Sequence, residues 1–327
     1  MESILVAGGA GFVGSHACKA LAKAGYRPIT LDNLATGHAD AVKWGPLITA
    51  DIRDSAAVRS AMREYQVTAV MHFAASSLVG ESVVKPALYY ENNVIASLRF
   101  LEALAAEGLK NIVFSSTAAV YGVAEQDPIT ETAALRPTNP YGETKRAIEG
   151  ALQWLGAAQG FSWTALRYFN AAGADEEAEI GERHDPETHL IPNMVRATLG
   201  TGPGLKVFGT DYPTPDGSAV RDYIHVTDLA EAHIAALVWQ RSGGASQAFN
   251  LGTGKGLSVL QMVAAAERVL GRTPPHELAG RRAGDPPSLV ADPSAAETAF
   301  GWKATRSDPD TLIRTAAVFE RSRAVSE

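Results

Sequence analysis

Short apolar runs alternate with amphipathic helical stretches along the first part of the chain. The runs at residues 4–7, 28–31, 67–73 and 111–114 have strand character. Between them, residues 13–24, 55–65 and 87–106 carry apolar side chains at helical spacing, and in the longest stretch Leu98, Leu101, Leu104 and Ala105 are expected to face inward. This alternation predicts an α/β fold, a doubly wound parallel (Rossmann) sheet with one ligand crevice at the carboxyl ends of its strands.

Beyond about residue 170 the pattern loosens into a polar, acidic stretch over 174–189 and a remainder richer in proline. No repeat or low-complexity linker separates the two parts. We therefore expect a Rossmann domain over 1–170 and a smaller α/β substrate domain over 171–327, interwoven so that some later segments return to the first domain. Ser258 with Gln261 forms a capping-box pattern for a helix ending near Gly271, and Asp228 with Glu231 resembles a second one.

The first apolar run is followed by a glycine-rich turn and then by a helix. Gly8, Gly11 and Gly14 let the backbone approach a pyrophosphate closely, and the helix N-terminus offers unpaired N–H groups to its charge. Asp32 ends the next strand 18 residues after Gly14. A carboxylate there accepts hydrogen bonds from the adenosine ribose hydroxyls and repels a 2′-phosphate. The pattern predicts a dinucleotide site that takes NAD rather than NADP.

Tyr141 precedes Lys145 by four residues, so both side chains lie on one face if the segment is helical. An ammonium about 4 Å from a phenol contributes on the order of 4 kcal/mol at a near-surface dielectric. That is roughly three pKa units, which would bring a tyrosine pKa of about 10 close to neutrality, where general bases work best. Taken alone, the same pattern also fits an ordinary amphipathic helix that starts at Pro140.

Composition narrows the class of protein. The chain has 327 residues, 46% of them hydrophobic, which is enough for a large core, and its formal net charge is −7. This negative balance and the scattered basic residues argue against a nucleic-acid partner. The single cysteine, Cys18, allows no intrachain disulfide and is expected to be a buried thiol of the first helix. No run approaches the ~20 apolar residues of a membrane span, so we expect a cytoplasmic enzyme without a membrane partner.

Two other kinds of site are not predicted. His184, Asp185, Glu187 and His189 lie close together in the sequence but lack a standard zinc spacing, which favours a solvated loop and no metal. No serine stands in a Gly-x-Ser-x-Gly nucleophile elbow, so a serine hydrolase is not indicated.

Short motifs of different sequence lie at residues 8–14, 32–34, 51–52, 73–75, 92–94, 115–117, 141–145 and 167–170. Together they resemble the extended short-chain dehydrogenases/reductases, that is, the NAD-dependent epimerase/dehydratase family. Three further segments, 207–214, 220–226 and 281–285, are more specific. They resemble the corresponding segments of the UDP-glucose 4-epimerases.

The resemblance implies a redox-neutral inversion at carbon 4 of a UDP-hexose, UDP-glucose or UDP-galactose. In the family mechanism a base removes the 4-hydroxyl proton while the hydride on carbon 4 passes to NAD. The resulting 4-keto sugar swings about its diphosphate linkage and takes the hydride back on its other face. NAD is therefore expected to stay tightly bound, and the family also implies a homodimer.

The resemblance also assigns residues. Catalysis would fall to Tyr141 as base, to Lys145, which would also hold the nicotinamide ribose, and to Thr117 on the same sugar oxygen. Arg221 and Arg282 would hold the diphosphate through charge-assisted guanidinium bonds. The cofactor set is Gly8, Gly11, Phe12, Val13, Gly14, Asp32, Asn33, Asp51, Ile52, Phe73, Ala74, Ala75, Asn93, Ser115, Tyr141, Lys145 and Tyr168, and the substrate set is Thr117, Tyr141, Asn170, Phe208, Arg221, Arg282, Asp285 and Leu289.

Several alternatives stay open. Leu289 matches a position where tyrosine narrows the sugar pocket and small residues admit an N-acetyl group, so N-acetylhexosamine, pentose or uronate substrates are alternatives. A plain core leucine is the other interpretation of Leu289. Ser77 stands where some epimerases have a lysine, so a cationic contact to the cofactor or substrate is open. His189 stands where relatives often have asparagine, so that substrate contact is open too. A 4,6-dehydratase is disfavoured because two alanines, not an Asp-Glu pair, follow Thr117. A net NAD-dependent dehydrogenase and a non-catalytic NAD-sensing protein are the remaining rivals.

Overall fold

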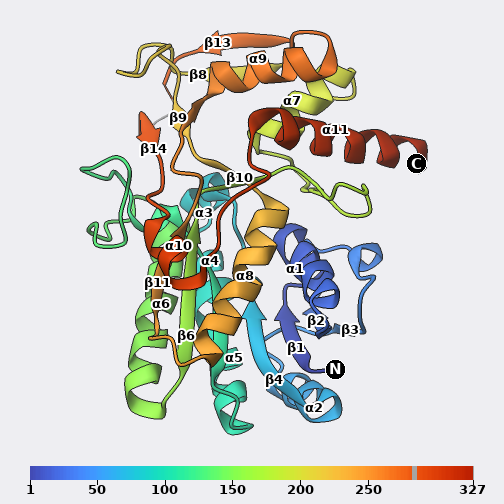
Figure 1. Cartoon of the computed structure of the whole chain (residues 1–327), viewed down its shortest axis with the longest axis vertical. Coiled ribbons are helices and arrows are strands. Elements are labelled where there is room, and N and C mark those ends of the chain that lie inside the picture. Colours follow the sequence, from blue (N-terminus) through green and yellow to red (C-terminus); the bar gives the residue numbers. More distant parts are fainter. Residues whose placement is uncertain (282–285, 327) are drawn as a thin grey trace.

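The computed structural model describes residues 1–281 and 286–326, and its centre is a seven-stranded parallel sheet (Figure 1). The strand order is β11-β6-β5-β4-β1-β2-β3, which confirms the doubly wound class. The order reverses between β1 and β4, the place where such sheets open a ligand crevice. The strands are β1 Ser3–Ala7, β2 Arg27–Asp32, β3 Leu47–Thr49, β4 Val67–His72, β5 Asn111–Thr117, β6 Ser162–Tyr168 and β11 Gln247–Leu251.

Helices cover both faces of this sheet. In β1, Leu5 and Ala7 share one core cluster with α2, α5 and α6, whereas Ile4 and Val6 share the other with α1 and α8. Because both faces are buried, the strands are unbroken apolar runs in the sequence. The helices are α1 Phe12–Lys23, α2 Ser55–Tyr65, α5 Ala96–Ala106, α6 Pro140–Gln159 and α8 Val226–Arg241.

The elements of the second region gather beyond the carboxyl ends of the central strands (Figure 1). Helices α7 Leu190–Leu199, α9 Val259–Leu270 and α11 Pro309–Ser326 pack on one another around a separate apolar cluster. Three small sheets accompany them: β7 Asn170–Ala172 with β10 Tyr223–His225, β9 Val220–Arg221 with β12 Leu257–Ser258 and β14 Ser288–Leu289, and β8 Leu205–Phe208 with β13 His276–Ala279.

The later half of the chain also returns to the central layers. Strand β11 extends the main sheet, and α8 and α10, Ser294–Phe300, pack on it. The domain boundary at residue 170 stays a prediction. Among the described residues, no helix combines the length and the apolar character needed to cross a membrane.

The helix predicted over 87–106 is not regular. It is divided into α4 Pro86–Tyr89, a π-helical turn η2 Tyr90–Ile95 and α5, preceded by α3 Val79–Val84. Leu101 and Leu104 are buried as expected, but Leu98 is 38% exposed, so its inward placement was wrong. A π-turn holds more residues per turn than an α-helix and thereby rotates the face that follows it.

Two local predictions also differ from the structure, and one is confirmed. Helix α8 begins at Val226, and His225 is its N-cap residue, because His225 Nδ1 accepts a hydrogen bond from the backbone N–H of Thr227. The prediction of Asp228 as the cap was therefore wrong. Buried Asp228 instead accepts bonds from the 305–307 segment. Strand β5 runs three residues further than expected, because 115–117 pair with β6. The capping box that starts α9 at Ser258 is confirmed.

Candidate active site

The glycine turn after β1 is tightly packed at Gly8 and Gly14. Gly8 has φ +80°, and a Cβ there would meet the Ala74 backbone nitrogen at 2.5 Å. A Cβ on Gly14 would collide with the Gly8 carbonyl oxygen. Gly11 differs, because the nearest atom to its Cβ position is 3.4 Å away. The fold itself therefore requires glycine at 8 and 14, whereas at 11 it leaves space beside the backbone that suits a close ligand.

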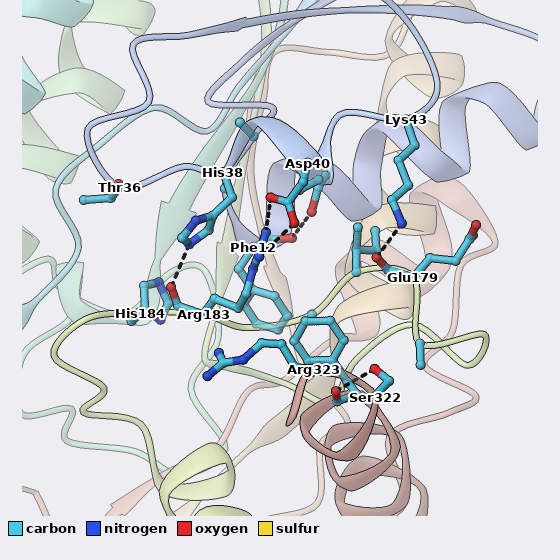
Figure 2. A pocket seen from close by; sticks show the side chains of 18 residues that line it. Phe12, Thr36, His38, Asp40, Lys43, Glu179, Arg183, His184, Ser322 and Arg323 are labelled. Atoms are coloured by element: carbon cyan, nitrogen blue, oxygen red, sulfur yellow. Dashed lines mark hydrogen bonds and ion pairs between the residues drawn. The ribbon is translucent and has the colours of Figure 1, made fainter. Parts of the chain in front are cut away.

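Helix α1 starts from this turn with an open N-terminus. Gly11 is its N-cap residue, no side chain caps it, and its first turn holds no acidic residue. The first N–H groups are therefore available to an anion. A cavity of about 330 Å³ adjoins the turn and is lined by Gly11, Phe12, His38 and the 178–184 loop (Figure 2). None of the predicted catalytic residues lines this cavity.

Asp32 is held at the end of β2 by two backbone groups. Its Oδ2 accepts a hydrogen bond from Ala10 N at 3.0 Å and its Oδ1 one from Leu34 N at 2.8 Å. Each carboxylate oxygen keeps a further lone pair for a hydroxyl donor. Asn33 donates to Asp51 at 2.9 Å, so two predicted adenosine contacts are joined. The pKa of Asp51 falls to about 2 because Arg53 donates hydrogen bonds to its carboxylate.

The segment after β4 lies against the glycine turn. The backbone N–H groups of Phe73 and Ala74 both donate to the Ala7 carbonyl, at 2.7 and 3.0 Å. Asn93 lies beneath this segment with no exposed surface, accepts from Ser76 N at 2.8 Å and donates to Thr144 at 3.0 Å. Its amide thus ties loop 74–76 to α6 and positions this loop.

The three predicted catalytic residues meet at the carboxyl edge of the sheet. Thr117 is the last residue of β5, and its hydroxyl is hydrogen-bonded to the Tyr141 phenol. Asn139 caps α6 by accepting a bond from Gly142 N at 2.9 Å, which starts the helix at Pro140. A Cβ on Gly142 would collide with the Ala119 carbonyl oxygen, so glycine is needed to bring α6 against 118–120, the short helix η3.

Lys145 lies one turn further along α6 and is only 2% exposed. Its Nζ donates to the Ser115 carbonyl at 2.8 Å and stands 4.8 Å from the centre of the Phe114 ring. The Ser115 hydroxyl is in turn hydrogen-bonded to the Tyr168 phenol. Lys145 is therefore anchored on β5, within reach of the same crevice as Thr117.

The electrostatics differ from the expectation that Lys145 alone brings the phenol to neutrality. Burial raises the pKa of Tyr141 to about 12, against the opposing effect of the Thr117 hydrogen bond. Burial likewise lowers the pKa of Lys145 to about 7, opposed by the charge of Glu149. Desolvation disfavours both charged forms, so the polypeptide by itself does not supply a low-pKa phenol and the expectation was wrong.

An ion pair that the sequence pattern did not predict lies close to Lys145. Arg167 and Glu149, whose side chains are 6% and 7% exposed, are joined at 2.5 Å and 3.0 Å, and Ser116 also donates to Glu149 at 2.5 Å. Glu149 follows Lys145 by four residues, as Lys145 follows Tyr141. This one-turn spacing is a sequence signal for Glu149 on the face of Tyr141 and Lys145, but it does not point to Arg167 on β6.

Apart from Thr117, Tyr141 and Asn170, the predicted substrate residues come from the second region. Arg221 of β9 and Leu289 of β14 are register partners, and the Arg221 guanidinium donates to the Val220 and Pro286 carbonyls at 2.8 and 3.0 Å. Half-buried Leu289 packs on the apolar cluster of Ala118, Val120, Tyr121 and Ile129. The first three of these residues follow Thr117 closely in the chain. Asn170 begins β7 and Phe208 ends β8, whereas Arg282 and Asp285 lie outside the described residues.

Comparison with known proteins places this geometry in a family. The model of the NAD dependent epimerase/dehydratase family matches residues 4–252. A UDP-glucose 4-epimerase from Rhizobium leguminosarum bv. trifolii is 48% identical over 96% of each chain. The crystal structure of the Brucella ovis UDP-glucose 4-epimerase in complex with NAD is 50% identical over 98% of each chain, with a TM-score of 0.95.

A second solved structure, the Stenotrophomonas maltophila UDP-glucose-4-epimerase with bound NAD and formylated UDP-arabinopyranose, is 39% identical over the full length of both chains, with a TM-score of 0.97. The Bifidobacterium longum UDP-glucose 4-epimerase in complex with NAD⁺ and UDP is 36% identical over 98% of this chain and 99% of that one, with a TM-score of 0.92. The chain therefore belongs to the NAD dependent epimerase/dehydratase family, among the UDP-glucose 4-epimerases.

Proposed function

We propose that the protein interconverts UDP-glucose and UDP-galactose with NAD held permanently in its crevice. The observation that carries this proposal is the meeting of Thr117, Tyr141 and Lys145 at the carboxyl edge of the sheet, in a chain that matches UDP-glucose 4-epimerases over nearly its whole length. Inversion at carbon 4 proceeds through transient oxidation to a 4-keto sugar, rotation of the sugar and re-reduction.

The residues around the glycine turn fit NAD. The space beside Gly11 and the open N-terminus of α1 suit the pyrophosphate, and the lone pairs of Asp32 suit the adenosine ribose hydroxyls. A 2′-phosphate would face the Asp32 carboxylate and be repelled. Bound NAD supplies the hydride acceptor that the protein lacks, and its positively charged nicotinamide ring favours an ionised phenol nearby.

In this proposal the chain's own residues manage the proton of the 4-hydroxyl. Tyr141 accepts that proton on its phenol oxygen, and Thr117 donates a hydrogen bond to the same sugar oxygen. Lys145 is anchored on the Ser115 carbonyl, and its protonated ammonium form stabilises negative charge on the Tyr141 oxygen. Glu149 and Arg167 hold the helix and strand in register beneath these groups.

The UDP moiety would lie against the second region. Arg221 of β9 would form a charge-assisted bond to a phosphate oxygen, and Asn170 of β7 and Phe208 of β8 would be further contacts. The contributions of Arg282 and Asp285 rest on the motif resemblance alone, since both lie outside the described residues.

The test of the function is turnover without added cofactor. Purified protein should convert UDP-galactose to UDP-glucose with no NAD supplied, and denaturation should release about one NAD per chain and no NADP. Chromatography identifies both the sugar and the nucleotide. Net accumulation of NADH, or turnover only in proportion to added NAD, would instead indicate a dehydrogenase.

Leu289 is expected to set the sugar range. A side chain of intermediate size favours UDP-glucose and UDP-galactose and leaves slower turnover of the N-acetylated pair. Leu289→Tyr should suppress the N-acetylated substrates by roughly ten- to a hundredfold in kcat/KM, because overpacking costs about 1–3 kcal/mol, and it should spare UDP-galactose. Leu289→Cys should enhance their turnover.

The matched control is Leu278→Tyr, on the exposed side of β13, where the leucine is 63% exposed. It should leave the ratio of kcat/KM for the two substrate pairs unchanged. The same unchanged ratio in both Leu289 variants would show that Leu289 is only a core leucine.

We infer a homodimer from the apolar surface of the segment that runs from α3 to α5. Within this stretch Val79, Val83, Val84, Leu88, Tyr90, Ile95 and Leu98 are all 38% exposed or more in the single chain. A surface of this kind on consecutive helical segments is typical of an interface, and a second copy of the chain can cover it symmetrically.

The double variant Val84→Glu/Leu88→Glu should therefore halve the mass measured by size exclusion with light scattering. Burying two unpaired carboxylates in an apolar interface has a large free-energy cost, which opposes dimer association. Val238→Glu, at an exposed position on α8, is the control and should keep the parent mass. A parent protein that already has the mass of one chain would refute the dimer.

A further inference from the structure

The loop between β7 and α7 brings two carboxylates and two imidazoles together. One ligand atom each of Glu182, His184, Glu187 and His189 lies within 4.8 Å of all the others. The sequence favoured a solvated loop over His184, Asp185, Glu187 and His189, which holds for exposed Asp185 but is wrong for Glu187, whose side chain is only 3% exposed. The side chain of Glu182, which that prediction did not include, is 6% exposed. Two buried acids on one short loop need a cationic partner.

The spacing of the donor atoms suits a metal ion. His184 Nδ1 lies 3.0 Å from Glu182 Oε1 and 3.8 Å from Glu187 Oε2, and His189 Nδ1 lies 2.5 Å from Glu182 Oε1 and 3.3 Å from Glu187 Oε1. Ligands at about 2.0–2.1 Å from a tetrahedral ion stand roughly 3.3 Å apart. The observed distances lie on both sides of this value.

Glu187 leaves one oxygen without a protein partner. Its Oε1 accepts from the backbone N–H groups of Thr188 and His189, at 2.8 and 2.9 Å, and so holds the start of α7. Its Oε2 is buried, makes no hydrogen bond and faces the cluster. His189 Nδ1 is likewise buried and makes no properly directed hydrogen bond, although Glu182 lies 2.5 Å away. His184 Nδ1 is hydrogen-bonded to Glu182 Oε1 at 3.0 Å, so the two atoms of the cluster without a hydrogen-bond partner are Glu187 Oε2 and His189 Nδ1.

A neighbouring acidic cluster shows the contrast. The carboxylates of Asp175, Glu177 and Glu179 all bind the Lys19 ammonium, at 2.7, 2.6 and 2.6 Å, so the protein supplies the cation there. Over residues 1–281 and 286–326, no lysine or arginine forms an ion pair with Glu182 or Glu187. The cation for this second cluster has to come from the two histidines or from outside the chain.

We propose that Glu182, His184, Glu187 and His189 bind one divalent transition-metal ion, with Zn²⁺ as the best match to two imidazoles and two carboxylates. Two imidazoles and two carboxylates favour Zn²⁺ over Ca²⁺ or Mg²⁺, which prefer six or more oxygen ligands. The ion joins the 182–189 loop to the first turn of α7. Because His184 also lines the cavity beside Phe12 and His38, an entry path is present (Figure 2).

The experiment uses untagged holoenzyme, stripped with EDTA, exchanged into metal-free buffer and then exposed to Zn²⁺ or Co²⁺. We expect about one ion per chain by elemental analysis and visible Co²⁺ absorption bands of tetrahedral intensity. Zn²⁺ at a hundredfold excess over its Kd should raise the Tm by about 5 °C. Less than a tenth of an ion per chain, with no shift in Tm, would overturn the proposal.

Two variants locate the site. Glu187→Gln removes the unpartnered anionic oxygen but keeps an acceptor for the α7 backbone, and His184→Gln removes one imidazole; each should weaken Zn²⁺ binding by tenfold or more. His276→Gln, at an exposed position on β13, is the matched control and should bind like the parent. Parent-like affinity in both variants would place any bound ion elsewhere. The metal content of the parent is measured without substitution, and its NAD content is recorded separately, so this result is independent of the proposed epimerase activity.

Discussion

Replacing Tyr141 by phenylalanine lowers kcat for UDP-galactose by about 10²- to 10⁴-fold, the usual loss for a general base. The ring and its packing remain, but the ionisable oxygen that is hydrogen-bonded to Thr117 is gone. Because the phenol acts on the sugar hydroxyl and not on the nucleotide, UDP binding should be nearly unchanged. Steady-state kinetics and titration calorimetry with UDP measure the two effects separately.

Two further substitutions sharpen this test. Tyr65→Phe on α2 also removes one phenol oxygen, remote from the crevice, and should leave kcat unchanged. Lys145→Ala should slow turnover and move the pH profile upward, because the ammonium no longer stabilises an ionised phenol. A Tyr141→Phe enzyme with near-normal turnover would contradict the role of the phenol as base.

Acidification should unfold the protein at a pH well above the pKa values of its carboxylates. His16, His72, His225 and His233 are 3% exposed or less, and burial lowers their pKa values to about 4, 3, 4 and 4. The unfolded chain binds these protons near pH 6.5 and the folded chain does not, so the free energy of unfolding falls as pH falls below 6.5. At pH 5 each histidine costs up to about 2 kcal/mol, or about 8 kcal/mol together, which is comparable to a whole domain's stability.

Urea unfolding of the holoenzyme at pH 7, 6 and 5 measures this dependence. The double variant His72→Phe/His233→Phe should lose about half of the slope between pH 6.5 and 5, because two of the four proton sites are gone. His276→Phe changes an exposed histidine and should keep the parent slope. An equal free energy of unfolding of the parent at pH 7 and pH 5 would show that folding does not lower the pKa values of these histidines.

The nucleotide-binding half could be predicted because its signals are local. The glycine turn, the following helix and Asp32 lie within one strand-helix-strand unit, and α2 spans the predicted residues, Ser55–Tyr65. Tyr141 and Lys145 lie on one helix, so their spacing alone places them on a common face. Each of these features depends on bonds and periodicities that span a few residues.

Other features are decided by contacts between distant segments. Thr117 meets Tyr141 because Gly142 lets α6 approach 118–120, and Leu289 lies beside Arg221 because two short strands pair in register. The Glu149 and Arg167 pair joins a helix to a strand in the same way. Spacing along the chain carries little information about such pairings, which follow from the packing of whole elements.

The sequence by itself determined the fold class, the NAD-type crevice and the catalytic helix, since strand and helix periodicity and the turn chemistry of glycine are properties of neighbouring residues. Only the tertiary structure decided the electrostatics. Burial raises the pKa of Tyr141 and lowers that of Lys145, and it encloses Glu182 and Glu187 in a loop that is strongly polar in the sequence. Desolvation depends on every atom packed around a charge, and those atoms come from all parts of the chain.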